Sequence, residues 1–214
     1  QSEAAQDLAG QAAYMTALET RGRLDRALEG LPDPLEIAAR EEAGAGLTRP
    51  ELAVLLAYGK LDLFDDIIAS ASPDDPYFVA TLEAYFPKGM RKFGEEMKRH
   101  RLRREIVATV VGNEMVNLCG PTFPSRLMAA AGCDVAELVT GFEAARQVLR
   151  FAEVWERVEA LDGHIPAAGQ TALFRELAYL LRGQTFWLAR KADREGLRVQ
   201  GLIDAYRPAV DRLK

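Results

Sequence analysis

The chain has 214 residues, of which 49% are hydrophobic and 28% are charged, and its formal net charge is −5. These values are typical of a globular protein that buries a core in one large domain or two small ones, and they exclude a disordered or low-complexity chain. Two cysteines and two histidines are too few for a disulfide scaffold or for extensive metal chemistry. The acidic balance disfavours a protein whose whole surface binds nucleic acid.

We expect no export signal in the first residues, because the chain opens with Gln1 and continues with polar and alanine-rich residues. Charged residues interrupt every apolar run well before the ~20 residues that a membrane span requires. We therefore expect no membrane partner. Two cysteines are too few to cross-link the fold by disulfides, which favours a reducing, cytoplasmic compartment. An opening residue other than methionine also leads us to expect a piece of a longer polypeptide.

Helix signals follow one another along the first half of the chain. Apolar residues spaced three and four apart predict a helix over residues 3–20, and a short helix follows over residues 24–31. Residues 33–36 (Asp-Pro-Leu-Glu) form a capping box with proline at the first helical position. Residues 48–51 (Thr-Arg-Pro-Glu) repeat this signal before a strongly amphipathic helix. A loop at residues 72–76 then leads into another helix.

The second half of the chain is helical by the same criteria. We expect its longest helix over residues 95–118, about 36 Å in length, with an apolar stripe of Leu102, Ile106, Val110, Asn113 and Asn117. A third capping box at residues 134–137 starts another helix, and Trp155 lies either in its continuation or in a separate helix. A further long helix follows Pro166.

No segment matches the alternating pattern of a strand, and no internal repeat of fixed period is present. The predicted fold class is therefore all-α, an irregular bundle of about eight to ten helices with one long central helix. We expect N-terminal helices at residues 1–46 to pack on a main bundle at residues 47–214.

Side chains that could carry catalysis are sparse. The sequence contains neither the glycine fingerprint of a dinucleotide site nor a P-loop. His100 lies among arginines, so we interpret it as solvent-facing, and we interpret His164 as a loop residue; neither is expected to bind a metal ion. Cys119 and Cys133 are typical of buried free cysteines. We therefore predict no catalytic, cofactor-binding or metal-binding residue in this chain.

One stretch of the chain is strongly basic, and it offers a candidate interaction surface formed by Lys98, Arg99, Arg101, Arg103 and Arg104. Between residues 87 and 104, eight Lys or Arg and two Glu give a local charge of +6. Residues 61–87 contain six Asp or Glu and no cation, a charge of −6. Because neighbouring blocks of opposite charge often pair with each other, we favour internal neutralisation over nucleic-acid binding.

Asn113 and Asn117 lie four residues apart on the expected apolar stripe of the helix at 95–118. Buried amides require hydrogen-bond partners, so this spacing predicts a buried polar network with a neighbouring helix. A small-ligand site between helices near Asn113 is the less favoured interpretation.

Six segments of the sequence, taken in order, resemble those of a known protein family. They are LTRPELAVLLAY at 47–58, DDPY at 74–77, YFP at 85–87, HRLRREIVAT at 100–109, the segment 113–117, and the turn at 161–167. In this order they resemble the C-terminal helical region of the large bacterial NAD-specific glutamate dehydrogenases. Those enzymes interconvert L-glutamate with 2-oxoglutarate and ammonium, using NAD. Their dehydrogenase core precedes the helical region, and none of its motifs is found here.

The resemblance implies a non-catalytic C-terminal domain, with NAD as the cofactor of the parent enzyme and no cofactor in this chain. It also implies the remainder of the same polypeptide as a partner, a homo-oligomeric parent enzyme, and a role in packing, assembly or regulation. The rival interpretation is a free-standing binding module that uses residues 98–104 to contact nucleic acid or an acidic protein.

Overall fold

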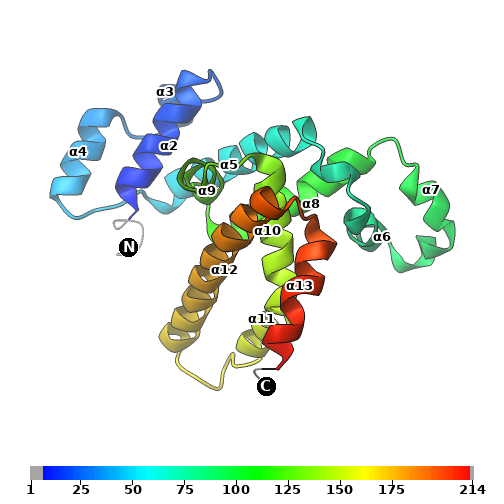
Figure 1. Ribbon diagram of the computed structural model, residues 1–214. Coiled ribbons are helices and arrows are strands. Elements are labelled where there is room, and N and C mark those ends of the chain that lie inside the picture. Colours follow the sequence, from blue (N-terminus) through cyan, green and yellow to red (C-terminus); the bar gives the residue numbers. More distant parts are fainter. Residues whose placement is uncertain (1–6, 213–214) are drawn as a thin grey trace.

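The computed structural model describes residues 7–212, apart from the side chain of Arg91. Within these residues it contains twelve α-helices, ten of them of seven or more residues, together with short 3-10 helices and no strand. The predicted all-α class is therefore confirmed. Figure 1 shows a small N-terminal lobe, a bundle of longer helices, and a group of short helices that projects on the side away from that lobe.

The N-terminal lobe consists of α2 (Leu8–Thr20), α3 (Arg26–Glu29) and α4 (Pro34–Glu42), and it packs on the first half of α5 (Arg49–Ala69). Its small core contains Leu8, Tyr14, Met15, Leu18, Leu24, Leu31, Ile37, Leu47 and Leu55. Because Leu55 lies in α5, that helix joins the lobe to the bundle. A domain boundary after residue 46 stays a prediction, and residues 3–6 of the expected first helix lie outside the described part of the chain.

Local capping signals place the starts of several helices as the sequence predicts. Thr48 and Asp134 each take part in both bonds of a capping box, at the starts of α5 and α10 (Val135–Val148). At the start of α4, the side chain of Asp33 accepts a hydrogen bond from the Glu36 amide, while the Glu36 side chain pairs with Arg40 instead of closing the box. These side chains satisfy amides that have no partner within the first turn.

The bundle is formed by α8 (Arg103–Cys119), α10, α12 (Ala167–Glu195) and α13 (Val199–Asp211), with α9 (Phe123–Ala131) and α11 (Phe151–Glu159) beside them. Its most extensive helix pair is α10 with α12. The largest fully buried side chains of this core include Met115, Phe142, Leu181, Leu188 and Leu202. Arg150 adopts a left-handed conformation with φ 51°, so the chain turns there and Trp155 lies in a separate helix.

The predicted continuous helix over residues 95–118 is wrong, because the chain turns between α7 (Gly94–Lys98) and α8. The His100 amide donates to the carbonyl oxygen of Met97 over 3.0 Å, and the His100 ring nitrogen Nδ1 accepts from the Leu102 amide over 3.2 Å. These bonds replace the backbone hydrogen bonds that a continuous helix would form at residues 99–102. The longest helix is instead α12, whose 29 residues span about 43 Å.

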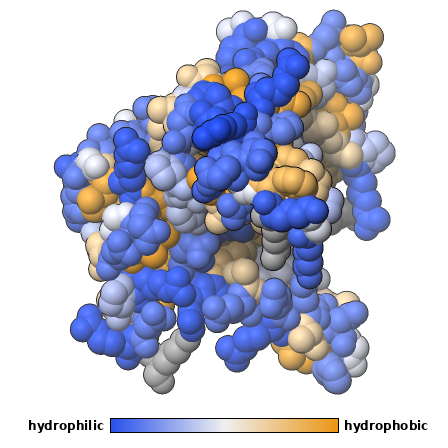
Figure 2. All heavy atoms as spheres, turned by 90° about the vertical axis from the view of Figure 1, so that its right-hand side faces the viewer, coloured by the Kyte–Doolittle hydropathy of each residue, from blue (hydrophilic) through white to orange (hydrophobic). Residues whose placement is uncertain are grey.

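The projecting group contains η1 (Ser72–Asp74), η2 (Pro76–Phe78), α6 (Val79–Tyr85), η3 (Lys88–Phe93) and α7. Figure 2 views the molecule from this side and shows separate apolar patches among hydrophilic side chains. Met90, Phe93 and Leu102 are among the exposed large apolar residues of this part.

Candidate functional site

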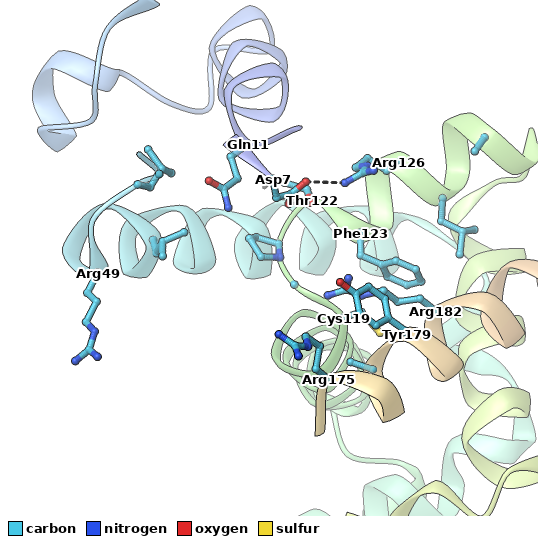
Figure 3. Close-up of a pocket in the computed structure, with 18 of the residues that line it drawn as sticks. Asp7, Gln11, Arg49, Cys119, Thr122, Phe123, Arg126, Arg175, Tyr179 and Arg182 are labelled. Atoms are coloured by element: carbon cyan, nitrogen blue, oxygen red, sulfur yellow. Dashed lines mark hydrogen bonds and ion pairs between the residues drawn. The ribbon is translucent and has the colours of Figure 1, made fainter. Parts of the chain in front are cut away.

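A cleft of about 1730 Å³ lies between the N-terminal lobe and helices α9 and α12. Its walls come from the start of α2, the loop between α4 and α5, the α8–α9 loop and one side of α12. In Figure 3, Arg49 extends from the start of α5 on one side, and Arg175 and Arg182 extend from α12 on the other. The cleft therefore brings together side chains that are far apart in the sequence.

Among residues 7–212, five arginines and one carboxylate line this cleft. The carboxylate is Asp7, whose Oδ1 lies 2.8 Å from an Nη of Arg126 and whose Oδ2 accepts a 3.3 Å bond from the Thr122 hydroxyl. Figure 3 marks the first of these contacts. Arg40 is also neutralised, since it binds Glu51 at 2.7 Å and Glu36 at 2.5 Å.

Arg182 lies in the wall of the cleft, where its guanidinium sits 5.6 Å from the centre of the Tyr179 ring. Its Nε is buried without a hydrogen-bond partner. The neighbouring Cys119 supplies no compensating charge, because burial raises the pKa of this thiol to about 12 although Arg182 lowers it. No carboxylate of residues 7–212 forms an ion pair with Arg182.

Gln11 also lines the cleft, and Figure 3 shows its side chain extending from α2 toward the α8–α9 loop. The residue is only 6% exposed, and its Oε1 has no hydrogen-bond partner. Buried polar atoms are normally paired, so this acceptor is a second unsatisfied group in the lining.

None of these cleft residues follows from a sequence motif. Arg49, Arg126 and Arg182 lie on three different helices, and only their tertiary arrangement makes them neighbours. The one local signal is the spacing of Arg175, Tyr179 and Arg182, which places all three on one side of α12.

The predicted basic stretch is divided between paired and exposed cations. Arg103 and Arg104 both form ion pairs with Asp74, and Arg104 also donates to the carbonyl oxygens of Ile68 and Ser70 over 2.7 and 2.9 Å. Internal neutralisation is therefore confirmed for these two arginines.

The remaining cations of the stretch are more exposed. Lys98 pairs with Glu95 at 2.7 Å, within the same short helix, whereas Arg99 and Arg101 are exposed. The proposed interaction surface at residues 98–104 stays a prediction, and it now depends chiefly on Arg99 and Arg101.

Asn113 and Asn117 do not form the predicted buried polar network. Asn117 is exposed and Asn113 is only partly buried, and Leu102 of the same expected stripe is 46% exposed. The buried face of α8 is instead formed by Ile106, Val107, Ala108, Val111, Gly112, Met115, Val116 and Cys119. The reason is tertiary, since α5 packs on this neighbouring face of the helix, with smaller contacts from α6, η1 and α12.

A buried charged cluster that the sequence analysis missed joins α8 to α10. Arg146 contacts Glu143 at 3.1 Å and also pairs with Glu114, and the Tyr77 hydroxyl donates to Glu143 over 3.4 Å. Burial raises the pKa of Glu143, and the Arg146 charge opposes this shift. The only signal in the sequence is the three-residue spacing of Glu143 and Arg146. We interpret this cluster as structural, because it lies inside the helix packing.

The residues most often used in catalysis lie apart from one another. His100 contacts Phe86 and holds the turn before α8, while His164 is exposed in the loop before α12. Burial raises the pKa of Cys133 to about 11. Across residues 7–212, no group of three His, Cys, Asp or Glu side chains is placed to hold a metal ion. None of the helices in this range is both long and apolar enough to cross a membrane.

Comparison with known proteins identifies the family of this chain. The family model described as "Glutamate dehydrogenase, C-terminal" matches residues 44–214. The chain belongs to this family. The resemblance found in the sequence is thereby confirmed, and it covers the bundle, the projecting helices and α5.

Three curated relatives agree with this family, and each is named an NAD-specific glutamate dehydrogenase. The protein from Halomonas elongata is 38% identical over 94% of this chain and 12% of its own length. The protein from Pseudomonas aeruginosa is 43% identical over 85% of this chain and 11% of its own. The protein from Mycobacterium tuberculosis is 36% identical over 77% and 10%. The chain therefore spans about a tenth of the length of these relatives.

Proposed function

We propose that this chain is the non-catalytic, C-terminal helical part of an NAD-specific glutamate dehydrogenase and that it packs against the rest of that polypeptide. The parent enzyme converts L-glutamate, NAD and water into 2-oxoglutarate, ammonium and NADH. The observation that carries the proposal is the match of residues 44–214 to the family's C-terminal region, together with relatives of which the chain spans only about a tenth.

The chemistry of the described side chains supports a non-catalytic role. Both thiols have raised pKa values, so they are protonated near neutral pH and are weak nucleophiles. The Nδ1 of His100 is engaged by the Leu102 amide. The sequence also lacks the glycine pattern through which a dinucleotide fold approaches a pyrophosphate.

Exposed apolar residues support a role in packing. Leu173, Leu180 and Trp187 lie seven residues apart on α12 and are 40%, 46% and 43% exposed. This spacing aligns them along one side of the helix, a pattern that suits contact with another helix. We propose the remainder of the same polypeptide as the covering partner, within a homo-oligomeric cytoplasmic enzyme.

The test compares the isolated chain with the full-length polypeptide that contains it. With glutamate and NAD, we expect NADH formation by the full-length protein and none above background by residues 1–214. We also expect the separately expressed remainder to co-purify with the isolated chain. Turnover by the isolated chain, or tight NAD binding to it in calorimetry, would contradict the proposal.

A further inference from the structure

The cleft between the N-terminal lobe and α12 contains positive charge that the described residues do not balance. Arg40 and Arg126 bind carboxylates of this chain, whereas Arg49 and Arg182 form no ion pair within residues 7–212. The buried, unpartnered Nε of Arg182 adds an unsatisfied donor. Arg182 is partly buried and Arg49 is exposed, so both leave positive charge in the cleft that an anionic ligand would complement.

The size of the cleft indicates what kind of anion fits. Pockets for small molecules usually measure ~300–1,000 Å³, whereas this cleft measures about 1730 Å³. Its walls add the aromatic side chains Phe123, Tyr179 and Phe186 to the arginines. A wide, partly aromatic and basic cleft suits a polypeptide segment that carries both acidic and apolar side chains.

One side chain indicates the contacts that such a segment would make. Asp7 already occupies one end of the cleft, with its carboxylate on Arg126 and Thr122. Carboxylates of another segment can pair with the remaining arginines in the same way, and its apolar side chains suit the aromatic walls.

We propose that an acidic segment from the remainder of the same polypeptide binds in this cleft, with its carboxylates on Arg182 and Arg49. The lengths of the relatives support the remainder of the polypeptide as the source of this segment, because the curated relatives are about eight to ten times longer than the part that this chain matches. The inference rests on the proposed function, and it specifies which surface meets the rest of the polypeptide and by what chemistry.

The test places a photo-crosslinking residue in the full-length polypeptide by the substitution Tyr179→p-benzoylphenylalanine. Tyr179 is 53% exposed and lines the cleft. A matched protein carries the same residue at Trp187, which lies about 80° around α12 from Tyr179 and outside the cleft lining. After irradiation, we expect mass spectrometry to find Tyr179 joined to an Asp- or Glu-rich peptide outside these 214 residues.

Charge reversal then tests the arginines. We expect Arg182→Glu, and separately Arg49→Glu, to lower the yield of this crosslink about fivefold or more, because each places like charges together. Arg49 is exposed, so its variant keeps the test valid if Arg182→Glu fails to fold. Arg194→Glu is the matched control, since Arg194 is exposed on the same helix outside the cleft, and we expect an unchanged yield.

Several outcomes would overturn the inference: Tyr179 crosslinks confined to these 214 residues, crosslinks to a segment without acidic residues, or yields unaffected by reversal at Arg49 and Arg182. If Trp187 reaches the remainder of the polypeptide and Tyr179 does not, the cleft inference fails while the packing proposal stands. If neither position reaches the remainder, the packing proposal is contradicted as well.

Discussion

Gly141 of α10 lies directly against the backbone of Ala189 in α12. A Cβ added at Gly141 would stand 2.5 Å from the Ala189 nitrogen and 2.8 Å from its Cα, with the Thr185 carbonyl oxygen also at 2.8 Å. All three atoms belong to backbone, which does not move aside as the end of a flexible side chain does. The close packing of α10 on α12 therefore requires a residue without a Cβ at position 141.

This contact predicts a large loss of stability on adding one methyl group. We expect Gly141→Ala to lower the free energy of unfolding by about 3 kcal/mol or more, since overpacking forces two helices apart. Gly183 of α12 is the matched control, because a Cβ there meets open space. Gly183→Ala should raise stability by about 0.5 kcal/mol through helix propensity. Urea titration of both variants measures the difference, and equal effects would contradict the prediction.

The buried cluster of Glu143 and Arg146 predicts a stability change that depends on pH. Replacing Arg146 with methionine leaves a buried carboxylate unpaired, at an expected cost of about 3 kcal/mol. The folded-state pKa of Glu143 is already raised above 4.5 by burial. The stabilisation that comes from protonated Glu143 is thus present below pH 4.5 and is lost as pH rises through the folded-state pKa. The defect of Arg146→Met should therefore grow toward neutral pH.

A second substitution provides the control for this cluster. The double variant Glu143→Gln plus Arg146→Met has no buried charge at this pair, so its stability should vary less with pH than that of Arg146→Met. Thermal unfolding across a pH series compares the two. A defect of Arg146→Met that stays constant with pH would show that lost packing, rather than charge, is responsible.

The ion pair of Glu51 with Arg40 should stabilise the fold with the opposite dependence on pH. Its hydrogen bond with Arg40 is the main cause that lowers the Glu51 pKa from 4.5 to about 2. The stabilisation is thus present above pH 4.5 and lost as pH falls toward about 2. Glu51→Gln preserves the capping box but removes the ion pair, so we expect a loss of about 1–2 kcal/mol near neutral pH that disappears in acid. Glu42→Gln, at an exposed position, should have little effect at any pH.

Arg104 and Arg101 should differ in their effects on stability although both belong to the basic stretch. Arg104 pairs with Asp74 and donates to two backbone carbonyls at the C-terminal end of α5, whereas Arg101 is exposed. We expect Arg104→Ala to lower the free energy of unfolding by about 1–2 kcal/mol. Arg101→Ala should change it by less than about 0.5 kcal/mol. Chemical denaturation tests this, and equal losses would argue against a structural role for Arg104.

Heparin chromatography separates the packing role from the rival binding module. We expect weak retention of residues 1–214, because Lys98, Arg103 and Arg104 are paired within the chain and Arg99 and Arg101 are left as two exposed cations of the stretch. Arg99→Glu plus Arg101→Glu should therefore lower the salt needed for elution only slightly. Phosphate and sulfate contacts weaken steeply with salt. Strong, salt-sensitive retention that this double variant abolishes would favour the binding module.

Local signals in the sequence predicted much of the helical layout. The capping box at Thr48 depends only on residues within one helical turn, and the structure contains both of its hydrogen bonds. The continuous helix through His100 failed because a side chain to backbone bond at Leu102 competes with the helical ladder. Periodicity does not register such competition, since it counts apolar positions and not hydrogen bonds.

The sequence by itself determined the all-α class, the starts of several helices and membership of the glutamate dehydrogenase C-terminal family. These features depend on short-range hydrogen bonding, on apolar periodicity and on ordered strings of residues. Only the tertiary structure decided which face of α8 is buried and that Arg49, Arg126 and Arg182 share one cleft. The physical reason is that burial and ion pairing depend on distances between helices, which packing sets and local spacing does not encode.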